Sequence, residues 1–147
     1  MFRHVLIPTD GSRLAARGVR AGVRFARALG ARVSGVYVML PSLPRGGEAA
    51  VFYAGLSAGG WRRQFEQAAR KALAVIEKEA RAAKVPCTTV IVRDAPPWKG
   101  ILAAARRRRC DAIVLSSHGR GALGGLILGS ETQGVLAHSK IPVLVAR

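Results

Sequence analysis

The sequence predicts an α/β fold in which an open five-stranded, mainly parallel sheet carries helices on both faces. Short apolar segments alternate along the chain with longer segments of helical periodicity, which is the order expected of a parallel sheet. Segments such as Asp111–Ser116 are also apolar nearly throughout, as in strands that are buried on both faces. The 147 residues are enough for one domain of ordinary size, so we expect a single domain over residues 1–147.

Five segments have the composition of strands. The first, Arg3–Pro8, is a short apolar run that is followed by Asp10-Gly11, and such a dipeptide is typical of the turn after a strand. The second, Arg32–Leu40, is rich in β-branched and apolar residues. The other three predicted strands are Cys87–Val92, Asp111–Ser116 and Pro142–Ala146.

Four segments are predicted to be helices. In the first of them, small and apolar residues recur at helical spacing, Ser12 can cap its start and Gly30 can end it. The predicted helices are Leu14–Leu29, Trp61–Lys84, Trp98–Arg109 and Ser130–His138. Residues 41–60, between the second strand and the second helix, are rich in Pro and Gly, and we expect a loop there.

The composition excludes several classes of protein. Hydrophobic residues make up 50% of the chain, which is enough for a packed core and excludes disorder throughout. No stretch long enough to cross a membrane lacks charge and glycine, so we expect no membrane partner. Met1–Arg3 leads directly into an apolar strand without the features of a secretory signal. Because Cys87 and Cys110 form neither a CxxC pair nor a metal-ligand spacing, we expect a reducing cytoplasm and no metal site.

The chain carries a strong positive charge. It has 24 Lys and Arg against 8 Asp and Glu, so its formal net charge is +16. A field of this strength attracts anionic partners such as nucleotides, nucleic acids and acidic lipids. An arginine-rich composition without functional meaning produces the same excess, and we favour that interpretation.

Two groups of arginines are prominent. The first recurs in steps of four and three, which places its members on one face of the first predicted helix. They are Arg13, Arg17, Arg20, Arg24 and Arg27. We interpret this face as solvated, with an acidic partner or a phosphodiester backbone as the alternative. Arg106–Arg109 are consecutive and wrap around a helix end, and aromatic residues that stack bases make up only 5% of the chain, so we do not expect nucleic-acid binding.

A glycine-rich loop follows the fourth predicted strand and leads into a helix. Glycines allow backbone N–H groups to turn toward an anion, and a helix start adds unpaired N–H groups and a positive dipole end. The loop is neither a Walker A sequence nor the GxGxxG turn of a dinucleotide-binding fold. The alternative is purely structural: Ser130 and Gln133 have the spacing of a capping box, and the glycines would then only form a turn.

Four ordered segments resemble the universal stress protein family. They are VLIPTDGS (Val5–Ser12), DAIVLSSHGRG (Asp111–Gly121), LILGS (Leu126–Ser130) and IPVLVAR (Ile141–Arg147). The resemblance covers the whole chain except the loop at 41–60, which is variable in the family, and it implies an adenine-nucleotide alpha hydrolase-like, Rossmann-like fold. The family's nucleotide signature is Gly, two residues, Gly, nine residues and Gly-Ser or Gly-Thr. Here Gly119 and Gly129-Ser130 match it, and Ser116 stands at the first glycine position.

The resemblance implies which residues surround a bound ATP, with or without Mg²⁺. Asp10 would lie beside the adenosine, Val38 would pack on the adenine, and Leu115 and Ser116 would line the ribose. The phosphates would be held by the glycine-rich loop and the helix start. The implied binding residues are Pro8, Thr9, Asp10, Val38, Leu115, Ser116, His118, Gly119, Gly129, Ser130, Glu131 and Thr132.

Two of these residues raise specific questions. The Cβ atom of Ser116 occupies space that glycine leaves open, and a positive φ there would strain the backbone, so we expect weakened rather than abolished ATP binding. Glu131 lies in the first helical turn, where its carboxylate suits the helix dipole but would repel phosphates unless a divalent cation lies between. We interpret Glu131 as a surface residue that points away.

The first functional hypothesis is a cytoplasmic, ATP-binding stress-response protein that acts as a dimeric signalling module. The family resemblance implies that strand 141–147 pairs with its counterpart in a homodimer, which also covers an exposed strand edge. We expect no catalytic residues, because His118 lacks a partnered nucleophile and acid.

Three alternatives remain. The protein binds no ATP and acts on a protein or nucleic acid through its basic surface, or it hydrolyses ATP slowly with Asp10, Glu131 and Mg²⁺. A phosphoacceptor receiver domain is the third, but that fold needs clustered acids after the first strand, and Asp10 stands alone there. Asp94 is the single candidate for the acid that a receiver places at the end of its third strand.

Overall fold

The structure is a computed structural model that describes residues 1–42, 58–117 and 128–146. All five predicted strands are present within these ranges: β1 (His4–Pro8), β2 (Arg32–Met39), β3 (Cys87–Arg93), β4 (Ala112–Ser116) and β5 (Val143–Ala146). The predicted helices are present as well: α1 (Arg13–Leu29), α3 (Ala58–Ala82), α4 (Pro97–Arg107) and α5 (Ser130–His138).

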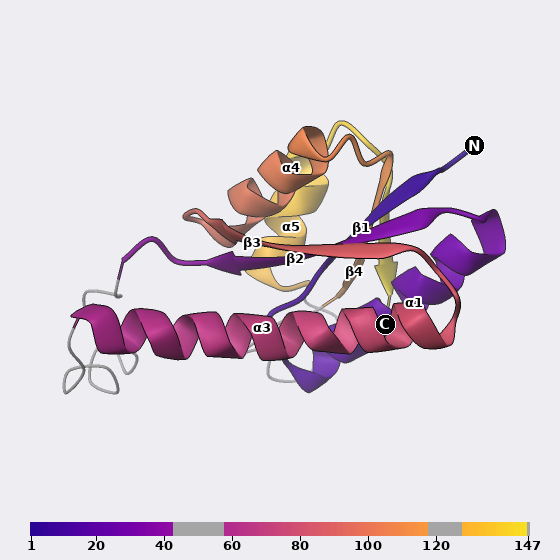
Figure 1. The fold of residues 1–147 in the computed structure, drawn as a ribbon. Helices are drawn as coiled ribbons and strands as arrows, with labels where there is room; N and C mark the ends of the chain where they lie inside the picture. The colour runs from indigo at the N-terminus through magenta and orange to yellow at the C-terminus, as the bar shows by residue number, and fades with distance from the viewer. Residues whose placement is uncertain (43–57, 118–127, 147) are drawn as a thin grey trace.

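The strands form one parallel sheet in the order β3-β2-β1-β4-β5. From β1 the chain winds outward through β2 to β3, then returns to the other side of β1 and continues through β4 to β5. Helices α1 and α3 cover one face of the sheet, and α4 and α5 cover the other (Figure 1). The predicted fold class is therefore confirmed.

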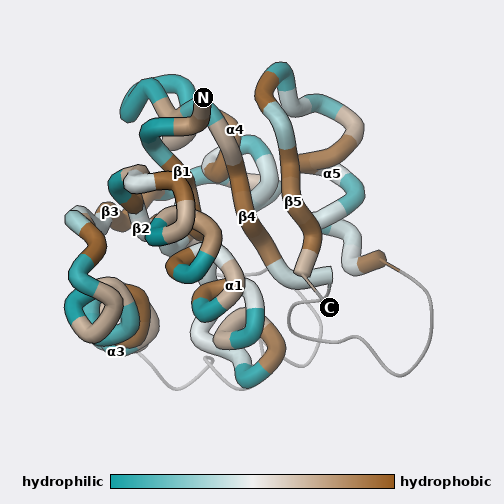
Figure 2. The backbone as a smooth tube through the Cα atoms, turned by 90° about the vertical axis from the view of Figure 1, so that its right-hand side faces the viewer, coloured by the Kyte–Doolittle hydropathy of each residue, from teal (hydrophilic) through white to brown (hydrophobic). Residues whose placement is uncertain are grey.

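Alternate residues of the strands fill two cores, one on each face. Val5 and Ile7 of β1 pack with Val19 and Val23 of α1. Leu6, which lies between them, packs on the other face with the α4 and α5 layer. β4 and β5 are hydrophobic along most of their length (Figure 2). β4 is buried along most of its length, as expected of a strand covered on both sides, whereas β5 is an edge strand without a buried residue.

Helices α3 and α4 end at Ala82 and Arg107, each two residues earlier than the sequence predicts. Two residues beyond each helix lies a residue with left-handed backbone conformation, Lys84 at φ 56° and Arg109 at φ 54°; Gly30, at φ 64°, plays this part after α1. The prediction continued both helices through these residues because no glycine marks their ends. The loop prediction at 41–60 was also too long, since α3 already begins at Ala58.

A polar chain crosses the sheet near the amino ends of the strands. The Nε2 atom of His4 lies 2.8 Å from Oγ of Ser34, and that hydroxyl lies 3.3 Å from Oγ1 of Thr88. The guanidinium of Arg108, at the end of α4, donates to the same Thr88 oxygen at 3.0 Å. His4 is buried, and its Nδ1 atom has no hydrogen-bond partner among the described residues.

Asp111 lies beside this chain and binds the start of β1. Its carboxylate accepts the backbone N–H of Arg3 at 2.7 Å and that of His4 at 2.9 Å. Burial opposes ionisation of Asp111, but these two N–H donors outweigh it and hold the pKa of the carboxyl below its usual value.

Burial lowers the pKa of His4. The positive charges of Arg32 and Arg108 act in the same direction, whereas the carboxylate of Asp111 and the backbone carbonyl of Arg108 oppose them. The folded protein therefore holds this histidine neutral at pH values where the unfolded chain already binds a proton.

We predict that the protein loses stability as the pH falls below about 6.5, the ordinary pKa of histidine. The unfolded chain takes up the His4 proton first, so the free energy of unfolding decreases by at most about 1.4 kcal/mol per pH unit from this one group. Urea unfolding at pH 7.5 and 5.5 measures the loss, and His4→Gln should remove most of it. An equal loss in H4Q would assign the effect to another group. Asp111, whose pKa is lowered in the folded protein, adds to the loss of stability only when the pH falls below about 4.

Candidate functional site

The candidate site lies at the carboxyl ends of β1 and β4, where the winding of the sheet reverses. The two strands are neighbours, with Val5 opposite Ala112 and Leu6 opposite Ile113. In open parallel sheets this is the place where ligands bind, because the loops on the two sides diverge there. The structure brings the predicted residues Pro8, Val38, Leu115 and Ser116 to this edge, at or next to the ends of β1, β2 and β4.

The turn after β1 is held by its own side chains. Asp10 accepts the backbone N–H of Ser12 through Oδ1 at 2.9 Å, and Thr9 accepts that of Gly11 through Oγ1 at 3.1 Å. Gly11 has φ 78°, which side chains rarely tolerate. Ser12 caps α1 as predicted, by accepting the N–H of Ala15. The carboxylate of Asp10 is thereby anchored at the mouth of the site.

The end of β4 is bonded directly to the start of α5. The hydroxyl of Thr132 donates to the carbonyl of Ser116 at 3.1 Å, and the N–H of Gly129 donates to the carbonyl of Ser117 at 3.0 Å. Both groups are thus used inside the protein. The N–H of Gly129 therefore already has an acceptor within the protein.

Helix α5 begins differently from the capping-box prediction. Gly129 is the N-cap residue, Ser130 is the first residue of the helix, and no side chain caps this end. The amide of Gln133 donates instead to the carbonyl of Leu128 at 2.7 Å. The helical ladder starts with Gln133 N–H on Gly129, so the N–H groups of residues 130–132 precede it and point along the helix axis. These groups can bind an anion.

Ser116 is not strained. Among the described residues other than glycine, positive φ occurs at Lys84 and Arg109, so the strain considered for Ser116 is absent. A Cβ atom at Gly18 of α1 would lie only 2.7 Å from the backbone nitrogen of Ser116. Helix α1 therefore packs directly on the backbone at the end of β4. The only remaining cost of serine at this position is the volume of its side chain.

Glu131 is partly buried, and its carboxylate makes a contact within the protein instead of extending freely into solvent. Its Oε2 atom accepts the backbone N–H of Trp98 at 2.7 Å. Helix α4 begins with Pro96 and Pro97 and has no cap from its own segment, so the carboxylate of α5 supplies the missing acceptor. A negative charge at a helix start is favourable. The helix dipole of α4 thus offsets part of the charge that would otherwise repel phosphates.

Trp98 joins α4 to α5, a role that its sequence did not lead us to expect. A Cβ atom at Gly134 would lie 2.4 Å from the Trp98 ring, and the ring of His138 stacks on it with centroids 4.3 Å apart. Nζ of Lys99 lies 5.6 Å from the ring centroid. The residues of α5 that contact Trp98 are Glu131, Gly134 and His138. Their spacing of three and four places them on one helical face, which was the available signal.

Helix α4 also supports the predicted adenine wall. A Cβ atom at Gly100 would lie 2.7 Å from a methyl group of Val38, so α4 packs closely against this side chain. The first two turns of α4 therefore contact Val38 at one end of the site and Glu131 at the other. Both the predicted base wall and the predicted phosphate turn depend on the position of this helix.

The remaining expectations concern two predicted binding residues, a metal site and a membrane-spanning helix. His118 and Gly119 lie outside the described residues. Within the described ranges, no three His, Cys, Asp or Glu side chains come together to hold a metal ion. The helices in those ranges include none that is both long and apolar enough to cross a membrane.

A five-stranded parallel sheet whose winding reverses between β1 and β4, with helices on both faces (Figure 1), defines a doubly wound α/β protein. The family model of the universal stress protein family matches residues 1–147. A universal stress protein of Thermus aquaticus, encoded in the 3′ region of a sulfhydrylase gene, is 34% identical over the full length of both chains. The chain belongs to the universal stress protein family.

Solved structures agree with the fold. The universal stress protein UspA from Lactobacillus plantarum superposes with a TM-score of 0.78 at 21% identity, over 99% of this chain and 98% of that one. A universal stress protein in complex with cAMP gives 0.68 at 23% identity over 99% and 97% of the two chains. One from Archaeoglobus fulgidus in complex with dAMP gives 0.63 at 19% over 100% and 98%.

We predict that Glu131→Ala lowers the free energy of unfolding by about 1–2 kcal/mol, because it leaves the Trp98 N–H without its charged acceptor. Glu131→Gln keeps an oxygen acceptor and should cost less than half as much. Urea unfolding followed by tryptophan fluorescence measures both. A change below about 0.5 kcal/mol for E131A, as expected of an exposed surface residue, would contradict the contact.

Proposed function

We propose that the protein binds an adenine nucleotide at the carboxyl ends of β1 and β4, with ATP as the first candidate. The observation that carries the proposal is the start of α5, which presents the N–H groups of residues 130–132 beside the end of β4. Such a helix start favours phosphate through its donors and its dipole. The cAMP and dAMP complexes of two relatives support an adenine nucleotide as the class of ligand.

The described residues suggest how a nucleotide would be divided over the site. Val38 would cover the adenine, and the anchored Asp10 would accept a hydrogen bond from the ribose. Leu115 and Ser116 would line the sugar, and the α5 start would hold the phosphates together with the predicted contacts of His118 and Gly119. A divalent cation such as Mg²⁺ would reach the phosphates with the nucleotide.

Signalling would use the contacts of α5. A phosphate at residues 130–132 changes the electrostatic surroundings of Glu131, whose carboxylate holds the start of α4. Bound and unbound forms would then differ in the position of α4, and a protein partner in the cytoplasm would distinguish them. The hydrolase alternative requires Asp10 and Glu131 as acids, but Glu131 already accepts the backbone N–H of Trp98. We therefore expect ATP hydrolysis to be slow at most.

We also propose a homodimer through the C-terminal strand, predicted as 141–147. β5 lies at the edge of the sheet, and Leu144 in it is 45% exposed. Pairing with a second copy would cover this edge and the leucine. Light scattering should give the mass of two chains; the mass of one chain at micromolar concentration would contradict the proposal.

We predict that Ser130→Asp weakens ATP binding at least tenfold, about 1.4 kcal/mol. Ser130 is exposed at the first position of α5, where an added carboxylate suits the helix dipole but repels a phosphate. Ser130→Asn is the neutral control of nearly equal shape and should bind ATP like the parent protein. Titration calorimetry with ATP and Mg²⁺ measures all three, and thermal unfolding should show that S130D is no less stable.

Equal ATP affinity of the S130D and S130N variants would remove the anion role of α5. Absence of binding in the parent protein would favour the alternative function, in which the basic surface acts without a nucleotide. Nucleotide released from the denatured, purified protein and identified by chromatography would show which ligand the site selects.

We predict that Ser116→Gly strengthens ATP binding by up to about tenfold. The backbone at Ser116 is unstrained, so the gain comes only from the space that the side chain vacates. Calorimetry on the variant measures it. Weaker binding in S116G would instead identify the serine hydroxyl as a contact that this chain uses in place of the family's glycine.

A further inference from the structure

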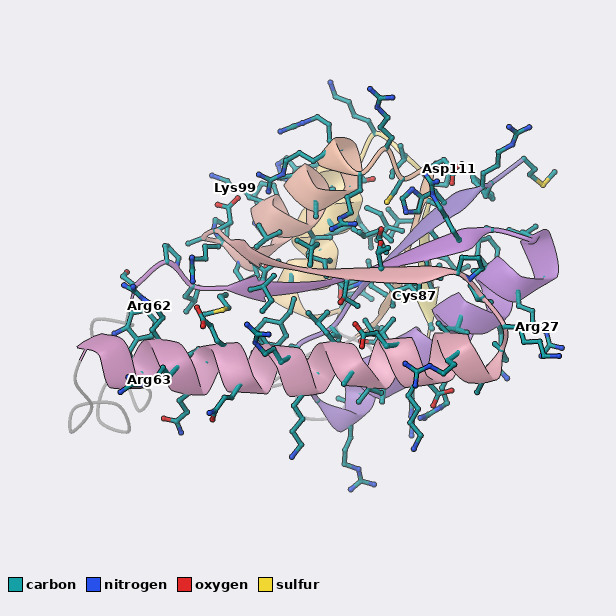
Figure 3. The ribbon with its side chains drawn as sticks, viewed as in Figure 1. Arg27, Arg62, Arg63, Cys87, Lys99 and Asp111 are labelled. Atoms are coloured by element: carbon teal, nitrogen blue, oxygen red, sulfur yellow. The ribbon has the colours of Figure 1, made fainter. Side chains whose placement is uncertain are left out.

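The amino ends of the strands gather basic residues that are far apart in the sequence. A cation precedes or begins every strand of the sheet, the helices that end at this edge add four more in their last turns, and Arg108 caps the end of α4. We call this set the amino-end surface. Its members are Arg3, Arg27, Arg32, Arg81, Lys84, Arg106, Arg107, Arg108, Arg109 and Lys140. Arg27 and Asp111 mark this end of the molecule in Figure 3.

The positive charge of this surface is not neutralised by neighbouring acids. Nine of its members are exposed, and Arg108 is partly exposed. Asp111 lies among them, but its carboxylate is turned to the backbone N–H groups of Arg3 and His4. Two acids of α3 also lie near this end: Glu79 in the last turn, and Glu77, whose Oε1 atom accepts the hydroxyl of Thr89 at 2.7 Å. In the described ranges, the ion pair within 4 Å joins Glu66 to Arg93, the last residue of β3, at the opposite end of that strand.

Two members occupy backbone positions that favour glycine. Helices α1, α3 and α4 end in the same hydrogen-bond pattern, with left-handed residues Gly30, Lys84 and Arg109 at equivalent positions. In each, the residue after the left-handed one donates to the carbonyl five residues earlier, as Val85 does to Ala80. Side chains in this conformation cost stability that glycine does not. Residues other than glycine are retained in such strained backbone conformations mainly where their side chains have a function.

We propose that the amino-end surface binds the phosphate backbone of double-stranded nucleic acid without reading its bases. Arginines, which form paired hydrogen bonds to phosphates, make up eight of its ten members. The described residues expose no Trp, Tyr or Phe among their large hydrophobic side chains, so the surface lacks both stacking platforms for single strands and aromatic anchors for a protein. Membrane binding would need an apolar face beside the cations.

The fold changes the expectation drawn from Arg106–Arg109 alone. Those four residues wrap around the end of α4, but the parallel sheet places Arg3, Arg32, Lys84 and Lys140 at the same edge. Four strand spacings of about 4.8 Å give this edge a width of roughly 19 Å, enough to contact several successive phosphates. The surface is at the opposite end of the strands from the nucleotide site, so the proposal stands without it.

The test uses the full chain and the double variant Lys84→Gly/Arg109→Gly. Fluorescence anisotropy with a labelled duplex of about 20 base pairs and mixed sequence measures binding over a series of salt concentrations. We expect at least tenfold weaker binding at low salt, and a slope of log affinity against log salt that is smaller by about 2. Because both positions favour glycine, the melting temperature of the variant should equal or exceed that of the parent.

The matched control is Arg62→Gln/Arg63→Gln. Both arginines are exposed and lie near the start of α3, at the other end of the molecule (Figure 3). Their replacement removes two positive charges, as many as the double glycine variant removes. This variant should weaken duplex binding less than threefold. A loss equal to that of the double glycine variant would show that only net charge matters and would overturn the proposal.

Three further outcomes would also overturn it. Unchanged duplex binding in the double glycine variant excludes the surface. A lower melting temperature of that variant with unchanged salt slope assigns Lys84 and Arg109 to the helix dipole, a purely structural role. Vesicles with anionic lipids, or an acidic peptide, that bind the parent more tightly than the duplex at about 0.15 M salt would identify a different partner.

Discussion

Direct contact between helices and sheet at glycine positions is the constraint on which the rest of this structure depends. Gly18 allows α1 to reach the backbone at the end of β4, and Gly100 allows α4 to reach Val38. An added Cβ atom at either position would overlap with its neighbour, so both helices would have to move away from the sheet. The close approach of Gly18 to the Ser116 backbone and of Gly100 to Val38 therefore fixes how near α1 and α4 lie to the candidate site.

The second consequence is that α4 and α5 position each other. Glu131 caps the start of α4, and Gly134 and His138 hold Trp98 against α5. The residue that caps one helix therefore belongs to the first turn of the other, where a phosphate would bind. Glu131, an acid that would repel a phosphate, thus links the start of α5 to the start of α4 through its hydrogen bond to Trp98.

The parallel sheet also gives the molecule two electrostatically different ends. Helix starts meet at the carboxyl ends of the strands, and helix ends meet at the amino ends. Positive dipole ends at the first edge suit a small anion, whereas negative dipole ends at the second favour cationic side chains such as Arg27, Arg81 and Arg107. Those side chains then extend into solvent and attract anions of their own. One topology thus underlies both of the proposed binding surfaces.

The sequence by itself determined the order of strands and helices, the fold class and the family. Apolar runs and helical periodicity are local signals, and the motif residues from Asp10 to Ser130 are read directly from their spacing. It also predicted that Pro8, Val38 and Ser116 lie at one edge of the sheet, because the carboxyl ends of parallel strands share an edge.

Only the tertiary structure decided what individual side chains do. Glu131 finds its partner Trp98 33 residues away, and the start of α5 uses Gly129 rather than Ser130 as its cap. The helix ends at Lys84 and Arg109 carry no glycine signal, and the cations of the amino-end surface meet only after the strands align. The physical reason is the same in each case: these contacts join segments distant in the chain, and local periodicity contains no information about such pairs.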